Sequence, residues 1–229
     1  MAHARVAAAA SLVFISACGS APQPATEVAP ASSATASSKS FDGTPWATFH
    51  SKRFELSLRL PDGPAWRIDD HKSPWLRATH EATRSKIALR SWREEENVTR
   101  GGCYARARAW DPSLPDLDAS RLLDDGVRSL DSQSARVIVG LAGTADASVD
   151  AAASIGGFVL AIVGEVRRCL LVAYETEAKG AAAEGQVADR LAIVADRLLP
   201  AIKLDQSFAP SREPAIGSRP GPGGAGGSR

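Results

Sequence analysis

The sequence predicts an α+β fold: a single domain in which an antiparallel sheet is packed by two main helices. Three observations support this class. Several segments alternate apolar and polar residues with the period of two that is typical of half-buried strands. The last segment before residue 205 repeats apolar residues at helical spacing. Along the chain the predicted elements run strands, helix, strands, helix, which favours an antiparallel sheet with helices packed against it.

The clearest strand is Phe54–Leu60, where every second residue is apolar and those between are polar or charged. The turn-forming residues 61–64 end this strand. Two further strands are predicted at 75–80 and 86–92, and the segment 81–85 between them is short enough for a hairpin. The first part of the domain is therefore expected to contribute antiparallel strands.

The middle of the chain opens with a break at Gly101-Gly102, after which alternation predicts a strand over Cys103–Trp110. A helix is expected next, capped by Asp116 or Asp118 and running to about Leu130. Its apolar stripe would consist of Leu123, Val127 and Leu130. Further strands are predicted at 136–142, 150–155, 158–166 and 169–176. The pair on either side of Gly156-Gly157 is expected to form a hairpin or a bulged strand.

The last predicted element is a helix over about Ala182–Leu204. Its apolar residues recur at spacings of four and three, so that one stripe faces the core. This stripe consists of Val187, Leu191, Val194, Leu198 and Ala201.

The motif Phe-x-Leu-x-Leu-x-Leu-Pro-x-Gly-x-x-Trp over Phe54–Trp66 precedes predicted hairpins, a middle helix, more strands and a C-terminal helix. This motif and this order of elements resemble the PsbP-like superfamily, which includes the DcrB-like proteins. The resemblance covers most of residues 44–205. It implies a non-enzymatic accessory or assembly role, and it carries over no functional residue.

The two ends of the chain differ in composition from the predicted domain at 44–205. Residues 18–43 are mostly Ala, Ser, Pro and Thr, and residues 206–229 end in a Gly- and Pro-rich stretch. Segments of this composition bury too little apolar surface to offset chain entropy, so both are expected to be disordered. Residues 18–43 would then act as a tether.

The first 17 residues have the pattern of a secretory signal. Arg5 lies before an apolar run from Val6 to Ile15, which is far shorter than the ~20 residues that span a bilayer. Small residues then lead directly to Cys18. This arrangement resembles the lipobox of bacterial lipoproteins, which implies cleavage after Ala17, acylation of Cys18 and anchoring in the cell envelope. In many Gram-negative bacteria, an aspartate directly after the acylated cysteine keeps a lipoprotein in the inner membrane. This sequence has Gly19 at that position, which favours the outer membrane.

The balance of charges and the absence of common catalytic motifs from the sequence argue against several classes of function. Without residues 1–17 the chain loses only Arg5, so 27 − 1 = 26 Lys and Arg balance 26 Asp and Glu. This balance gives no sign of a nucleic-acid partner. The chain lacks the nucleophile-elbow, HExxH zinc, P-loop and dinucleotide-binding motifs. Asp69-Asp70-His71 and Glu94-Glu95-Glu96 are typical of solvated loops, so no metal or other cofactor is expected.

Two cysteines remain after Cys18, at positions 103 and 169. In an exported protein such a pair favours a Cys103–Cys169 disulfide. Two alternatives stay open: a pair of buried free thiols, or a nucleophile at Cys103. A nucleophile would make the protein a thiol hydrolase and would need a base, for which His80 is the histidine on a predicted strand of the same sheet.

Arginine and aromatic residues share one face of three predicted strands, at period two. If these strands are neighbours, one sheet face gathers Trp75, Arg77, Arg90, Trp92, Tyr104, Arg106 and Arg108. Such a face suits a partner-binding hot spot or an anionic ligand, although arginine stems could equally cover the rings with nothing bound. The opposite face of the third strand carries Ala105, Ala107 and Ala109, and the C-terminal helix is expected to pack there.

These observations together predict a lipid-anchored envelope protein that is not an enzyme and that acts as an accessory or protein-binding module. The alternatives are the thiol hydrolase and a protein that binds a hydrophobic ligand between sheet and helix. The expected partners are the membrane, through the lipid, and an envelope protein.

Overall fold

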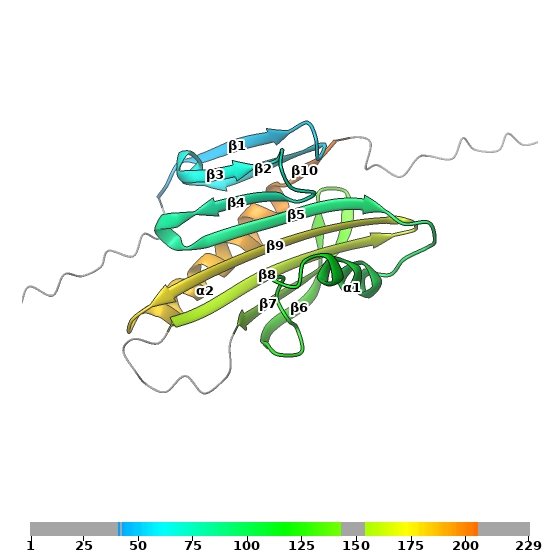
Figure 1. Cartoon of the computed structure of the whole chain (residues 1–229). Coiled ribbons are helices and arrows are strands. Elements are labelled where there is room, and N and C mark those ends of the chain that lie inside the picture. The colour runs from blue at the N-terminus through cyan, green and yellow to red at the C-terminus, as the bar shows by residue number, and fades with distance from the viewer. Residues whose placement is uncertain (1–40, 42, 143–153, 206–229) are drawn as a thin grey trace, which may run out of the picture. The chain divides into compact units, whose positions relative to one another are not determined.

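The computed structural model describes residues 41, 43–142 and 154–205. Its strands form a three-stranded sheet of order β1-β2-β10 and a seven-stranded sheet of order β3-β4-β5-β9-β8-β7-β6 (Figure 1). All the recorded strand pairings are antiparallel. With two helices, this architecture is that of the predicted α+β class. Membership of the PsbP-like superfamily stays a prediction.

The small sheet consists of β1 (Trp46–Ser51), β2 (Leu56–Pro61) and β10 (Lys203–Leu204). The large sheet consists of β3 (Trp66–Asp69), β4 (Leu76–His80), β5 (Ser85–Arg93), β9 (Arg168–Lys179), β8 (Ser154–Glu165), β7 (Gln133–Ala142) and β6 (Arg121–Leu130). The helices are α1 (Arg100–Trp110) and α2 (Ala183–Ile193), and α2 continues as a π-helical turn over Val194–Leu198 and a 3-10 turn over Leu199–Ala201. Short 3-10 turns also cover Gly63–Ala65 and Glu81–Thr83.

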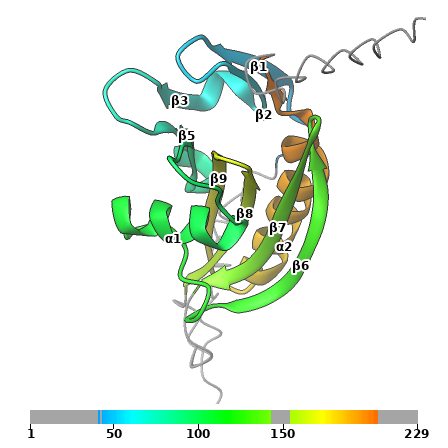
Figure 2. The ribbon, with the colours of Figure 1, turned by 90° about the vertical axis from the view of Figure 1, so that its right-hand side faces the viewer.

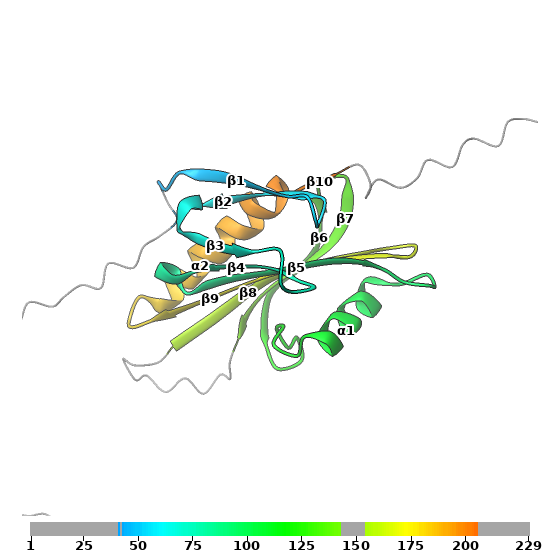
Figure 3. The same ribbon diagram turned by 45° about the horizontal axis from the view of Figure 1, so that its top comes forward.

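The two helices lie on opposite faces of the large sheet (Figure 2). The α2 face contains the larger core, which also buries the apolar side of β2, and α2 runs on the same side as the small sheet (Figure 3). The α1 face contains a second core. On β8, Val159, Ala161 and Val163 belong to the α2 core, whereas Phe158, Leu160 and Ile162 belong to the α1 core. This strand reads as an unbroken apolar run because both of its faces are buried.

Several predicted strands are confirmed. Phe54, Leu56, Leu58 and Leu60 are all buried, as the alternation predicts, but the strand β2 begins at Leu56, because residues 54 and 55 lie in a turn in which Glu55 has a positive φ. The strands expected at 75–80, 86–92, 136–142 and 169–176 correspond to β4, β5, β7 and β9. The prediction missed β1 and β3.

The segment Cys103–Trp110 is a helix, so the predicted strand is wrong. Thr99 caps α1, because its hydroxyl accepts a hydrogen bond from Gly102 N at 3.1 Å. Arginine and alanine are strong helix formers, and their strict alternation cannot distinguish the two structures. Cys103 and Ala107, four residues apart, are the buried positions of this helix.

The helix predicted to run to Leu130 is also wrong, because residues 121–130 form strand β6. Its spacing of apolar residues resembled a helical stripe, yet Leu123 and Val127 are exposed. Pairing with β7 over the length of β6, with a shift in register between Leu122 and Asp124, outweighs the local pattern.

Two further predictions need adjustment. The strands expected around Gly156-Gly157 are a single strand, β8, and residues 150–153 lie outside the described part of the chain. The C-terminal helix is confirmed over most of its length, with Val187, Leu191, Val194 and Leu198 buried, but its predicted end near Leu204 is wrong, because Ile202 is extended and Lys203–Leu204 form β10. It does not pack on Ala105, Ala107 and Ala109, because these alanines belong to α1 on the other side of the sheet.

The predicted signal peptide at 1–17, the tail at 206–229 and most of the tether at 18–43 lie outside the described residues. Phe41 is an exception, because it falls in the predicted tether but belongs to the core. It is only 2% exposed, and its ring lies 6.3 Å from that of Trp66 and 5.4 Å from that of His80.

Candidate functional site

A disulfide joins Cys103 of α1 to Cys169 of β9 and confirms the predicted pairing. The two Cα atoms are 5.6 Å apart, and both side chains are fully buried. Gly164 of β8 lets the helix approach closely, because a Cβ there would lie 2.8 Å from Arg100 N. The start of α1 is therefore held against the sheet by a covalent bond and by a contact that a larger residue would prevent.

The thiol-hydrolase arrangement is not assembled in this structure. The sulfur of Cys103 is bonded to Cys169, so it carries no thiol. His80 belongs to a different cluster: its Nε2 lies 3.2 Å from Asp62 Oδ2 and its Nδ1 lies 2.8 Å from Thr83 Oγ1. The ring of His80 is buried beside Phe41 and Trp66, in the core on the α2 face.

Four residues form what we call the tryptophan–arginine cluster: Trp75, Arg90, Trp92 and Trp110. The guanidinium carbon of Arg90 lies 3.8 Å from the ring centroid of Trp110 and 5.7 Å from that of Trp75. Trp92 and Trp110 meet edge to face, with centroids 5.2 Å apart. Trp110 is 41% exposed, whereas Trp75 is 3% exposed. The cluster thus has a buried base and an accessible indole at its surface.

Arg90 is the one cation of the tryptophan–arginine cluster, and no carboxylate pairs with it among the described residues. Neighbouring charges are paired: Arg77 Nη2 lies 2.5 Å from Asp111 Oδ2, and Arg106 Nε lies 3.6 Å from Glu94 Oε1. No hydrogen bond or ion pair joins Arg90 to another side chain in the described part of the chain. Burial lowers the pKa of Arg90, and stacking on indole compensates part of this desolvation. An anionic or polar group from outside could bind this guanidinium.

The structure brings together five of the seven residues predicted for the arginine–aromatic face. Trp75, Arg77, Arg90 and Trp92 lie on the α1 side of the sheet, and Arg106 reaches them through Glu94, which also accepts a hydrogen bond from Trp92 Nε1. They meet because α1 lies across the sheet face, not because a third strand adjoins it.

Tyr104 and Arg108 do not reach the tryptophan–arginine cluster; both contact the loop after α1. Four-residue spacing on a helix groups Tyr104 with Arg108 and groups Arg106 with Trp110, so the two pairs occupy different sides of α1. Tyr104 donates to Pro115 O, and Arg108 donates to Leu114 O and pairs with Asp116. Both residues hold the loop after α1. Trp110, which the predicted site omitted, takes their place in the cluster; its signal was its position on the same alternating face.

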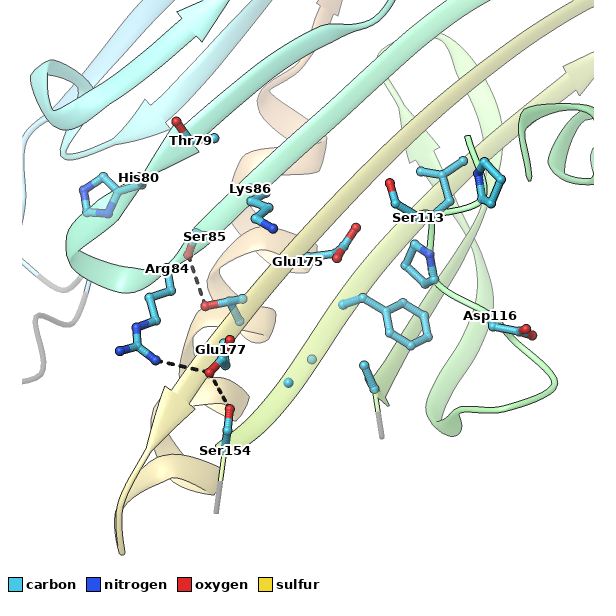
Figure 4. Close-up of a pocket in the computed structure, with 18 of the residues that line it drawn as sticks. Thr79, His80, Arg84, Ser85, Lys86, Ser113, Asp116, Ser154, Glu175 and Glu177 are labelled. Carbon is cyan, nitrogen blue, oxygen red and sulfur yellow. Dashed lines mark hydrogen bonds and ion pairs between the residues drawn. The ribbon is translucent and has the colours of Figure 1, made fainter. Parts of the chain in front are cut away.

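A cleft of about 800 Å³ opens on the α1 side of the sheet, next to the loop after α1 (Figure 4). Its sheet side is formed by the Ser85 end of β5, the Glu177 end of β9 and the Gly156 end of β8, and its other side by residues 112–116. Most charged groups at the cleft have partners. Arg84 pairs with Glu177 at 3.1 Å, and Glu177 accepts a hydrogen bond from Ser154.

Glu175 is a half-buried carboxyl of this cleft with no hydrogen-bond donor among the described residues. Burial raises its pKa, and attraction to Lys86 offsets part of this effect. For Asp111, the effect of hydrogen bonds on the pKa is larger than the effect of burial. Burial raises the pKa of Asp111, but hydrogen bonds from Ser113 and Arg77 outweigh it and hold the pKa below its usual value. No sequence pattern predicts the cleft, because its residues come from strands and a loop that are far apart in the chain.

Residues 41, 43–142 and 154–205 contain no group of three or more His, Cys, Asp or Glu that could hold a metal ion. In the same part of the chain, neither helix is long and apolar enough to cross a bilayer.

Comparison with known proteins gives only distant likenesses. No protein-family model matches the sequence, and no curated protein matches it. A Bacteroides thetaiotaomicron protein of known structure is similar at 8% identity and a TM-score of 0.38, over 69% of this chain and 47% of the other. LpqN of Mycobacterium tuberculosis, described as involved in cell envelope biogenesis, is similar at 12% identity and a TM-score of 0.39, over 72% of this chain and 87% of its own. The chain thus spans about half the length of the first protein. Both TM-scores are low, so neither likeness says what this chain does.

Proposed function

We propose that this chain is a lipoprotein of the bacterial cell envelope, anchored through Cys18, whose domain is a non-enzymatic module that binds an envelope protein. The outer membrane is the favoured location, because Gly19 follows the cysteine. In this proposal the tryptophan–arginine cluster contacts the partner. No nucleic acid, metal or other cofactor takes part.

The environment of Arg90 is the main support for the proposed partner contact. Its guanidinium stacks on an exposed indole and has no carboxylate partner in the described structure, while the arginines on either side are paired. Tryptophan and arginine supply many of the side chains that dominate protein interfaces. A partner carboxylate placed over Trp110 would satisfy Arg90 and cover the ring at the same time.

Among the alternatives, the thiol hydrolase has no support in the geometry, because the sulfur of Cys103 is committed to the disulfide and His80 lies in another cluster. The binding module therefore remains the function that these residues support best.

Anchoring is tested by the variant Cys18→Ser. If Cys18 carries the lipid, the wild-type chain will be found in membrane fractions and the variant in the periplasmic fraction, because the domain then has no acyl chain. Immunoblotting of fractionated cells measures this shift, and Ser20→Ala, in the same segment, is the matched control that leaves Cys18 and the disulfide intact. An unchanged membrane fraction for Cys18→Ser would contradict anchoring through this residue.

Partner contact is tested by placing a photo-crosslinking amino acid at position 110 in the native cell. We expect a discrete crosslinked species that is lost when Arg90 is also changed to Glu, because the new charge repels an acidic partner. Val127, which is 65% exposed on β6, is the control position and should give no such species. Arg90→Glu loses the stacking on Trp110 and Trp75, so we expect the free energy of unfolding to fall by about 1–2 kcal/mol while the domain stays folded, as thermal unfolding can verify. Identical species from positions 110 and 127 would show that the contact is not specific to the cluster.

A further inference from the structure

The cleft beside the loop after α1 is separate from the proposed partner contact. Within the described residues, most of the charged side chains that line it form ion pairs, but two do not. Arg84 pairs with Glu177, Arg108 with Asp116, and Glu81 with Arg67. Lys86 and Glu175 alone among the ionised side chains that line it have no ion pair or hydrogen bond in the described structure. These two residues are direct cross-strand partners on β5 and β9. Figure 4 shows both at the cleft, with no interaction drawn between them.

Glu175 and Lys86 lie on neighbouring strands, and neither forms an ion pair in the described structure. A ligand that binds both should therefore carry a positive group for Glu175 and a negative group for Lys86. Side chains directly opposite each other across a sheet have Cβ atoms about 4.5–5.5 Å apart. A ligand that satisfies both must therefore carry a cation and an anion only a few ångströms apart. Glu175 is half-buried without a donor, so an ammonium group that donates to it replaces lost hydration with a charge-assisted hydrogen bond. Lys86 is exposed and can donate to a carboxylate.

We infer that the cleft binds a zwitterionic α-amino acid or short peptide, with the ligand ammonium on Glu175 and the ligand carboxylate on Lys86. The volume of about 800 Å³ lies within the range of small-molecule pockets and leaves room for a side chain. Pro112 and Ala142, both exposed at the cleft, offer apolar surface to that side chain. Burial raises the pKa of Glu175 although Lys86 attracts its charged form, and an ammonium group at this carboxyl would lower that pKa.

Three probes that share one ring test this inference on the full chain by calorimetry. L-phenylalanine carries both charges, 3-phenylpropionate only the carboxylate and 2-phenylethylamine only the ammonium. We expect L-phenylalanine to bind about ten- to a hundredfold more tightly than either of the others, because each lost charged hydrogen bond weakens binding by about this factor. Equal affinity for all three probes, or no binding of L-phenylalanine at millimolar concentration, would overturn the inference.

Two variants then assign the charges. Glu175→Gln should weaken L-phenylalanine to the level of 3-phenylpropionate, and Lys86→Met should weaken it to the level of 2-phenylethylamine. Asp125→Asn, which removes an exposed acid paired with Arg136 outside the cleft, is the matched control and should change nothing. Circular dichroism confirms that each variant is folded. If both cleft variants bind L-phenylalanine as the wild type does, the ligand does not use these residues and the inference fails, whatever the outcome at the tryptophan–arginine cluster.

Discussion

Removing the disulfide with Cys103→Ala and Cys169→Ala will lower the free energy of unfolding by about 4 kcal/mol, because in the chain-entropy model the bond closes a long loop in the unfolded state. The two cysteines are 66 residues apart in sequence. For a domain of this size, the loss corresponds to a fall of roughly 10 °C in Tm. Denaturant titration of the oxidised wild type and of the double variant measures the difference.

The disulfide matters locally as well, because α1 has few other attachments to the core. Among the eleven residues of this helix, only Cys103 and Ala107 are buried. A helix of about this length is marginal in water without tertiary contacts. We therefore expect amides of α1 to exchange hydrogen much faster in the double variant, with Trp110 leaving Arg90. Partner crosslinking from position 110 should weaken in parallel.

The control for this experiment is Ala105→Ser with Ala109→Ser. These two residues lie on the exposed side of the same helix, so the double serine variant should lose only about 1 kcal/mol, which is the cost in helix propensity of two Ala→Ser changes. An equal loss in both double variants would mean that helix propensity, not the disulfide, sets the stability of α1.

The elements that sequence analysis predicted correctly are those whose local pattern has one interpretation. Over residues 54–60, four alternating apolar residues indicate a buried face, and the structure buries them all, although β2 begins only at Leu56. The disulfide followed from the export signal and from the number of cysteines. By contrast, alternating Ala and Arg in 103–110 is compatible with a strand and with a helix. What decides between them is distant in sequence: Cys169 and Gly164, which hold α1 against β8 and β9.

The residues predicted for the binding site were likewise placed correctly where a local pattern applies and wrongly where it does not. Trp75, Arg77, Arg90 and Trp92 were placed on one face correctly, because period two within a strand determines sidedness. Tyr104 and Arg108 were misplaced, because that period does not apply to a helix. The pairing of Lys86 with Glu175 across β5 and β9 depends on the register of two strands that are far apart in the chain. No local pattern predicts that register, so the cleft could not be found from the sequence.

The second large effect is expected at Arg190 of α2, which is only 4% exposed. Its Nη1 donates to Thr83 O at 2.9 Å, and to Thr176 Oγ1 and Glu177 O at 3.1 Å each. No carboxylate pairs with this guanidinium in the described part of the chain, and burial lowers its pKa. Arg190 thus joins α2 to β9 and to the turn after β4 through oxygen acceptors alone.

Arg190→Met will lower the free energy of unfolding by about 2–3 kcal/mol, as measured by denaturant titration. Methionine retains most of the apolar stem but leaves the acceptors without this donor, and an unsatisfied buried polar group costs about 1–3 kcal/mol. Thr83 O keeps a hydrogen bond from Thr176 Oγ1, so the loss should not reach the sum of three broken bonds.

The matched control is Arg197→Met, in the turn that continues α2. Arg197 is exposed and stacks on Trp46 with its guanidinium carbon 4.9 Å from the ring centroid, so its replacement should cost no more than about 1 kcal/mol. Replacing a buried charged group by an apolar one can also stabilise a protein, when desolvation of the charge outweighs its hydrogen bonds. A variant Arg190→Met as stable as the wild type would show that this balance holds here, and that the contacts of α2 with Val159 and its neighbours suffice to hold the helix on the sheet.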